Sequence, residues 1–251
     1  MIGAPGRIGL VGAAGRVIAV APAALVLPSA IASCVHWWSP AAGVTGSSVS
    51  SWVDAVAALD AVHATGASQP AFSATAFGAD DPGIVFDGVD DFLGFTGTGS
   101  LPVGDSPHVI LIRFIDAAAA DDGDVTRALI GWGSTTNTRS LQRNSAGGVD
   151  ALRAALAATN VNVTTAETLG QHWGMARYDG DQGFISQDGG AEAASAAGLT
   201  LATTTTGGRI GAAPVGASTT GWSGTIGDIG VFAAASLAGA DLTNMQAFFG
   251  R

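Results

Sequence analysis

The sequence has a single cysteine, no lysine and only two glutamates among its 251 residues. One cysteine, Cys34, excludes a disulfide within the chain, so packing and hydrogen bonding must hold the fold together. Charged residues make up 12% of the sequence, every basic residue is arginine, and the net charge is −10. No basic stripe interleaves with aromatic residues, which argues against nucleic acid and against anionic membrane surfaces as partners.

Small and apolar residues fill the rest of the chain. Hydrophobic residues account for 47% of it, many of them alanine, and there are 37 glycines. A chain of this length can bury one sizeable core. Few charges combined with many Gly, Ala, Ser and Thr residues favour a hydrogen-bonded β protein with short turns over a helical bundle.

The N-terminal segment has features of its own. GAPGRIGLV (3–11) and GAAGRVIAV (12–20) form a tandem nonapeptide, which predicts that residues 1–28 are an extended arm lying on a neighbouring subunit. The stretch VIAVAPAALVLPSAIASC also resembles a signal peptide with a lipoprotein cleavage box at Cys34, and processing there stays open. The apolar run is too short and too broken by prolines to cross a bilayer.

From residue 29 to residue 251, short apolar runs alternate with turn signals. Runs such as VILIRFI (109–115) and GTIGDIGVFA (224–233) recur without helical periodicity, which indicates a sandwich or barrel. Within the first run, Arg113 is expected to face solvent or a partner. The segment ALRAALAA (151–158) is compatible with helix or strand.

The C-terminus predicts the one clear helix. Ser236 can cap it and Asp241 lies early in it, which suits the positive end of a helix. Its apolar face is formed by Leu242, Met245, Phe248 and Phe249.

The stretch GIVFDGVDDFLGF (83–95) contains a reversal between two apolar runs. Asp87-Gly88 is a strong turn signal, because Gly accepts positive φ and Asp bonds its own backbone. Asp87, Asp90 and Asp91 could instead gather a cation or a ligand, although Asp-Gly turns are far commoner than metal sites.

Several of these motifs together resemble the concanavalin A-like lectin/glucanase superfamily, in its laminin-G-like jelly-roll branch of phage virion and bacterial surface proteins. The carrying segments are HWWSPAAGV, VSSWVDAV, QPAF, GIVFDGVDDFLGF, WGMARYDG, FISQDG, RIGAA, WSGTIGDIGVF and SLAGADLTNMQAFF. The resemblance implies an antiparallel jelly-roll β-sandwich over residues 29–251. It also implies that Phe86 and Phe92 are core residues, with Asp87 and Asp90 bonding backbone amides at the corner.

Catalytic chemistry is sparse. Hydrolytic members of the superfamily place two glutamates on one strand, whereas Glu167 and Glu192 stand in separate polar segments here. The histidines show no metal-ligand spacing. No cofactor is expected, but calcium remains an alternative at Asp121, Asp122 and Asp124, in the run DDGD.

Three tryptophans are the remaining binding candidates. Trp132, Trp173 and Trp222 could stack on sugar rings, or they could be core residues or subunit contacts. We therefore predict a non-enzymatic virion surface protein, a fibre or decoration of a phage or gene-transfer-type particle. It would join other virion subunits through its arm as a homo-oligomer, with a trimer as one candidate, and bind host glycans. Alternatives are a secreted or lipid-anchored bacterial carbohydrate-binding protein, or a degenerate glycan hydrolase.

Overall fold

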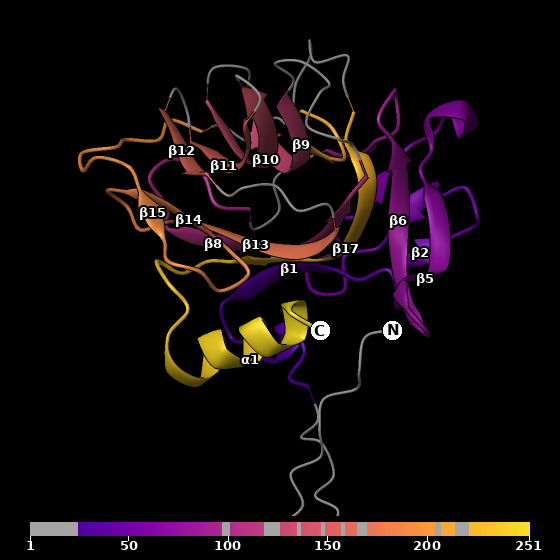
Figure 1. Cartoon of the computed structure of the whole chain (residues 1–251), viewed down its shortest axis with the longest axis horizontal. Coiled ribbons are helices and arrows are strands. Elements are labelled where there is room, and N and C mark those ends of the chain that lie inside the picture. Colours follow the sequence, from indigo (N-terminus) through magenta and orange to yellow (C-terminus); the bar gives the residue numbers. More distant parts are fainter. Residues whose placement is uncertain are drawn as a thin grey trace, which may run out of the picture.

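The computed structural model describes residues 25–96, 101–117, 126–134, 137–146, 149–156, 159–164, 170–203, 207–213 and 221–251. In these residues two antiparallel sheets face each other, and a single α-helix covers the far side of one of them (Figure 1). The expected all-β sandwich with a C-terminal helix is confirmed. The tandem repeat lies outside the described residues, so the extended arm stays a prediction.

The sheet beside the helix, called here the helix-side sheet, has its strands in the order β15-β14-β13-β8-β17-β6-β5. One further strand, β1, pairs with the C-terminal half of β17, from Ile229 to Phe232. The bounds are β1 Cys34–Trp38, β5 Ala71–Gly78, β6 Asp81–Asp87, β8 His108–Asp116, β13 Gly170–Tyr178, β14 Gly183–Gln187, β15 Ala193–Ala194 and β17 Ser223–Phe232.

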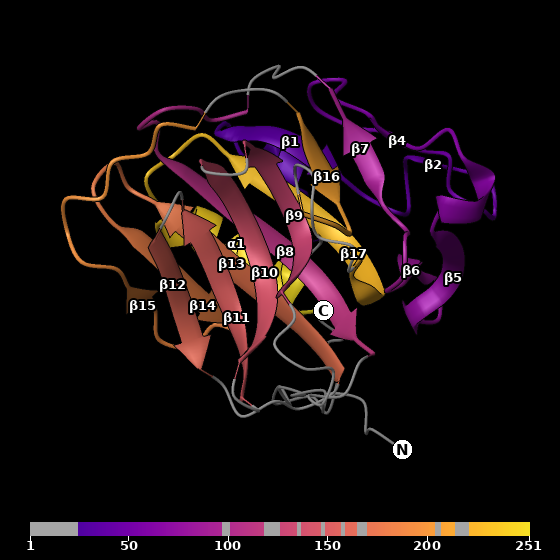
Figure 2. The same cartoon turned by 90° about the horizontal axis from the view of Figure 1, so that it is seen from above.

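The second sheet, called here the outer sheet, runs β12-β11-β10-β9-β16-β7-β4-β3-β2 (Figure 2). Its strands are β2 Val44–Thr45, β3 Ser51–Trp52, β4 Ala61–Val62, β7 Leu93–Phe95, β9 Thr126–Gly133, β10 Thr138–Ala146, β11 Val149–Leu156, β12 Thr159–Thr164 and β16 Gly208–Ile210. Two short 3-10 helices, η1 Pro28–Ala30 and η2 Gly66–Ser68, complete the elements. The segment that was compatible with helix or strand therefore falls largely in strand β11.

Strand β8 shows why the apolar runs of the helix-side sheet are continuous. Ile110 and Ile112 point between the sheets, while Val109 and Leu111 point toward the helix. A strand covered on both faces needs apolar residues at successive positions rather than at alternate ones. The central strands of the helix-side sheet therefore contribute side chains to two apolar layers, one between the sheets and one under the helix.

Helix α1 (Gly239–Phe249) forms the third layer. Met245, Phe248 and Phe249 are buried against the helix-side sheet, as expected from their spacing. The helix begins after Ala238 and has no side-chain cap, so the predicted capping role of Ser236 is wrong. Among the described residues, no helix is both long and apolar enough to span a membrane.

The corner between β6 and β7 is partly as expected. Phe86 is 2% exposed and lies in the core, which confirms its predicted position. Phe92 is only half-buried, stacked under the guanidinium of Arg209 at 4.4 Å from the ring centroid, so its core assignment is wrong. Leu93 and Phe95 are the inward residues of β7, because side chains alternate along a strand and Phe92 falls on the other face.

The acidic residues of the corner hold the turn. Asp87 accepts a hydrogen bond from the Val89 amide at 2.8 Å, and Asp91 accepts one from the Asp87 amide at 2.9 Å. Asp90 accepts from the Ser68 hydroxyl, so Asp91 takes the backbone-bonding role expected of Asp90. The turn also needs Gly88, whose φ is 82° and where a Cβ would lie 2.7 Å from a Ser223 carbon.

Arg113 corrects a further expectation, because it is 1% exposed rather than facing solvent. Its guanidinium donates to both carboxylate oxygens of Asp81 and lies 4.1 Å from the ring centroid of Phe77. Strands β6 and β5, which lie beyond β17 in the same sheet, supply the carboxylate and the ring that cover it, and neither partner is visible from the local sequence.

Candidate functional site

The three candidate tryptophans are buried. Trp132 is 1% exposed and donates to the Pro102 carbonyl at 3.0 Å, while Trp222 is fully buried against Phe114. Trp173 is 7% exposed and lies in the layer under α1. None of them presents an exposed ring face, which corrects the expectation of a stacking platform at these positions. All three occupy core positions, as the alternative interpretation had it.

Of the two acidic groups proposed as cation sites, only one lies in the described part of the chain. Asp121, Asp122 and Asp124 lie outside the described residues. The carboxylate oxygens of Asp87, Asp90 and Asp91 come within 4.8 Å of one another. Burial and the two neighbouring carboxylates raise the pKa of Asp91. Since all three side chains bond groups within the corner or beside it, their arrangement is explained by the turn.

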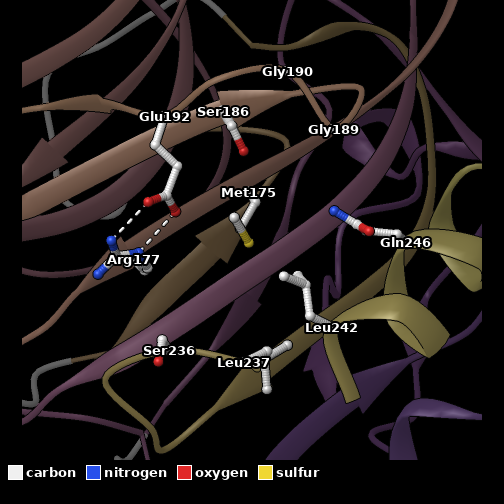
Figure 3. A pocket seen from close by; sticks show the side chains of 10 residues that line it. All are labelled: Met175, Arg177, Ser186, Gly189, Gly190, Glu192, Ser236, Leu237, Leu242 and Gln246. Atoms are coloured by element: carbon white, nitrogen blue, oxygen red, sulfur yellow. Dashed lines mark hydrogen bonds and ion pairs between the residues drawn. The ribbon is translucent and has the colours of Figure 1, made fainter. Parts of the chain in front are cut away.

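A pocket of about 240 Å³ opens beside α1, between the helix, strands β13 and β14 and the segment after β14 (Figure 3). Its floor is apolar, formed by Met175, Leu237 and Leu242. Polar side chains surround that floor on several sides, so the pocket offers both an apolar contact surface and directional hydrogen-bonding groups. The lining polar side chains are Arg177, Ser186, Glu192, Ser236 and Gln246.

The alternation of β13 places the first half of this site. Trp173, Met175 and Arg177 share the face of the strand that points to the helix side, and Met175 pairs with Ser186 of β14. The chain then reverses at Asp188 and Gly189, both with positive φ, and returns to bring Glu192 back over Arg177. Helix α1 supplies Leu242 and Gln246, which lie one turn apart on one face.

Arg177 and Glu192 form the charged wall of the pocket. Arg177 Nε donates to Glu192 Oε1 at 2.8 Å, and Nη2 donates to Oε2 at 2.7 Å. The guanidinium lies over the ring of Phe184, 3.4 Å from its centroid. A bidentate pair held on an aromatic face has one preferred geometry, so the Glu192 carboxylate is held in a defined position.

The other polar groups of the pocket are not used in this way. Gln246 extends its amide toward the pocket from α1, and the Ser186 hydroxyl approaches from β14 (Figure 3). Among the ten lining residues, the hydrogen bonds drawn join Arg177 to Glu192 alone. Ser186 is only 1% exposed, whereas Gln246 and Ser236 are more open, so the Gln246 amide and the Ser236 hydroxyl are the groups that a bound polar molecule can reach.

Reactive side chains elsewhere are held by the fold. Burial raises the pKa of the Cys34 thiol to about 12, so this cysteine is protonated and unreactive. His36 Nδ1 lies 2.7 Å from a carboxylate oxygen of Asp54, and both side chains are fully buried. Burial and the nearby charge of Arg139 lower the pKa of His108 to about 3.

Sequence reasoning did not select the pocket. Glu192 was noted only as one of two glutamates, and Arg177 and Gln246 were not considered as a site. The available signal was the alternation in WGMARY, which puts Met175 and Arg177 on one face of a strand. Their partners come from a loop and a helix distant in sequence.

No protein family's sequence profile matches the chain, and no curated protein matches it by sequence. Solved structures do resemble it in fold. Trypanosoma rangeli sialidase superposes with a TM-score of 0.58 at 17% identity, over 96% of this chain and 35% of the sialidase. The chain thus spans about a third of the length of the sialidases that it matches.

Two further structures have the same sandwich architecture. Domain 4 of an extracellular GH43 arabinanase from Geobacillus stearothermophilus, in complex with arabinotriose, gives a TM-score of 0.57 at 12% identity, over 85% of this chain and 98% of the domain. The binding domain of botulinum neurotoxin serotype D gives 0.54 at 8% identity, over 87% of this chain and 50% of that one. At these identities the similarity establishes the fold, an antiparallel β-sandwich of the jelly-roll type.

Proposed function

We propose that this protein is a non-catalytic, glycan-binding surface protein and that the pocket beside α1 holds the sugar. The observation that carries the proposal is the combination of an apolar floor with a fixed carboxylate, an amide and a hydroxyl around it. Sugars present C–H groups on their ring faces and hydroxyls at their edges. A site with this distribution of groups suits them.

The fold neighbours support the same class of ligand. One of them is a domain solved with arabinotriose, and others are sialidases solved with sialic acid or its analogues. The arabinanase domain is matched over nearly its whole length, so its likeness concerns a complete sandwich rather than a fragment of a larger fold. Glycan binding is therefore the function to test first.

The geometry of the pocket supports binding rather than cleavage. Glycoside hydrolysis requires a positioned acid together with a nucleophile or base, commonly two carboxyls about 5 Å apart in retaining enzymes. Glu192 is engaged by Arg177 through both of its oxygens. The second glutamate, Glu167, lies outside the described residues.

We also propose that the protein belongs to a virion, as a fibre or decoration of a phage or gene-transfer-type particle that presents the sandwich outward. The support is the resemblance of the sequence motifs and the tandem repeat in residues 3–20. Deleting residues 1–28 should leave a folded sandwich that no longer forms a homo-oligomer. Circular dichroism and light scattering check this, and an oligomer that survives the deletion would contradict the role of the arm.

A glycan array tests the binding function. Because one shallow pocket gives weak affinity, the protein should be displayed in many copies, for example on a bead or on its own oligomer. We expect a restricted set of glycans to be retained and no reducing ends to be released from them. Steady release of reducing ends would contradict the non-catalytic assignment, and a silent array would contradict glycan binding.

A further inference from the structure

We infer that the pocket beside α1 recognises an uncharged sugar residue at the end of a glycan, through two adjacent hydroxyls that donate to the Glu192 carboxylate. The inference rests on the proposed glycan-binding function and specifies the ligand of that site. It follows from the hydrogen-bonding capacity, the fixed position and the charge of the groups around the pocket.

The first step concerns the capacity of Glu192. An ionised carboxylate has two oxygens and about four sites for accepting hydrogen bonds. Arg177 uses one site on each oxygen, and the Glu192 side chain is 31% exposed. One acceptor site therefore remains on each of two neighbouring oxygens. Two hydroxyls on adjacent carbons of a sugar ring present two donors side by side, which matches this pair of acceptors.

The second step concerns position. The Arg177 guanidinium is fixed by the Phe184 ring on one side and by two hydrogen bonds to Glu192. The side chain of Arg177 is 15% exposed, so little of it is free to move. Because the carboxylate is already oriented before a ligand arrives, binding does not have to order it.

The third step concerns size and the remaining contacts. A volume of about 240 Å³ lies below the range of about 300–1,000 Å³ that encloses larger ligands, which suits a single sugar residue. Met175 and Leu242 can contact the C–H groups of the ring, while Gln246 can bond a substituent at its far edge. The two adjacent hydroxyls would thus bind Glu192 in the segment after β14, and the opposite edge of the sugar would bind Gln246 in α1.

The fourth step concerns charge. Arg177 is neutralised by Glu192, and Asp179 lies 3.9 Å from the same guanidinium. The whole chain carries a net charge of −10. No positive charge of the pocket is left to pair with a ligand carboxylate, so sialylated and other acidic glycans are disfavoured. The ligand class is therefore neutral, which separates this site from that of a protein that binds sialic acid.

The closing experiment compares the full chain with two variants on the same glycan array. Glu192→Gln keeps the shape of the side chain but removes its charge and one acceptor, and we expect its affinity to fall about 10-fold or more. Asp90→Asn, at the exposed corner away from the pocket, makes the same change of charge and should bind as the parent does. Thermal melting confirms that both variants are folded.

The ligand is tested separately by oxidation with periodate, which cleaves the bond between two carbons that carry adjacent hydroxyls. Neutral glycans that bind the parent should lose binding after this treatment. If glycans bind but Glu192→Gln binds them equally well, or acidic glycans are preferred, this inference is overturned and glycan binding stands. If no glycan binds the parent, both the proposed function and this inference fail.

Discussion

The polar groups at the ends of the inter-sheet core differ from those around the pocket in how fully they are hydrogen-bonded within the protein. Arg139 is fully buried at one end of the inter-sheet core, and its guanidinium donates to four groups. Arg177, on the opposite face of the helix-side sheet, shares a partly exposed carboxylate that still has accepting sites.

The comparison shows where function can be located in a sandwich of this kind. An unpaired buried polar group costs the full penalty of leaving water, and all three guanidinium nitrogens of the buried Arg139 are accordingly paired. Groups paired for that reason are unavailable to a ligand. Beside α1, Glu192, Ser236 and Gln246 border solvent, so the fold does not require all of their polar groups to be paired, and those left over can bind a ligand.

Removing packing from the inter-sheet core should have the largest effect. Phe86→Ala leaves a cavity at a residue that is 2% exposed, and we expect the free energy of unfolding to fall by about 3–5 kcal/mol. Phe92→Ala, six residues along at the half-buried position, should cost only about 1 kcal/mol. Urea denaturation of both variants measures the difference, and equal losses would show that the register of β7 is misassigned.

Two arginines allow a direct test of the comparison. Arg139→Leu leaves the hydroxyl of Thr203 and Nδ1 of His108, both on buried residues, without their donor, and we expect a loss of about 3 kcal/mol. Arg177→Leu leaves Glu192 able to reach water and should cost about 1 kcal/mol or less. A loss on Arg177→Leu as large as that on Arg139→Leu would contradict the distinction between the two regions.

Lowering the pH should reduce the free energy of unfolding, because His108 is buried in its neutral form at one end of the core. Arg139 can only donate, so its contact with His108 Nδ1 at 2.9 Å makes this nitrogen the acceptor of a neutral ring. The unfolded chain takes up a proton on this histidine near pH 6.5, whereas the folded chain does so only near pH 3. The unfolded state therefore binds more protons between these values, and the stability should fall as the pH drops through this interval.

The expected slope from this one group is roughly 1 kcal/mol per pH unit. Urea denaturation between pH 7 and pH 4 measures it. His108→Asn keeps an acceptor for Arg139 but does not titrate, so the variant should show a flatter dependence. An unchanged slope in the variant would assign the acid sensitivity to other groups.

The fold was largely predictable from the sequence. Short apolar runs, the Asp87-Gly88 turn and the apolar face of the C-terminal segment depend on residues close together in the chain, and each gave the correct element. The prediction that Phe92 lies in the core was wrong, because the side that a strand residue faces depends on register. The prediction that Ser236 caps the helix was wrong, because the helix starts three residues later, at Gly239.

The candidate site was not predictable in the same way. Tryptophans attract attention as sugar platforms, but a large apolar ring is equally what a two-layer core requires, and the structure uses Trp132 and Trp222 in that role. The pocket instead brings together β13, β14, the segment after it and α1. Its polar residues are unremarkable one by one, and only the tertiary structure sets Glu192 against Arg177.

The smallest effect on stability should come from Glu192→Gln, and it separates folding from function most sharply. The Glu192 side chain is 31% exposed and can be hydrated, so the loss of this ion pair should cost less than about 1 kcal/mol. Binding to a neutral glycan should nevertheless weaken about 10-fold, because the sugar loses a charged acceptor. Calorimetry on the folded variant and a binding titration measure the two quantities side by side. A variant that loses stability and binding in proportion would mean that Glu192 acts through the fold; lost binding with retained stability places its role at the ligand.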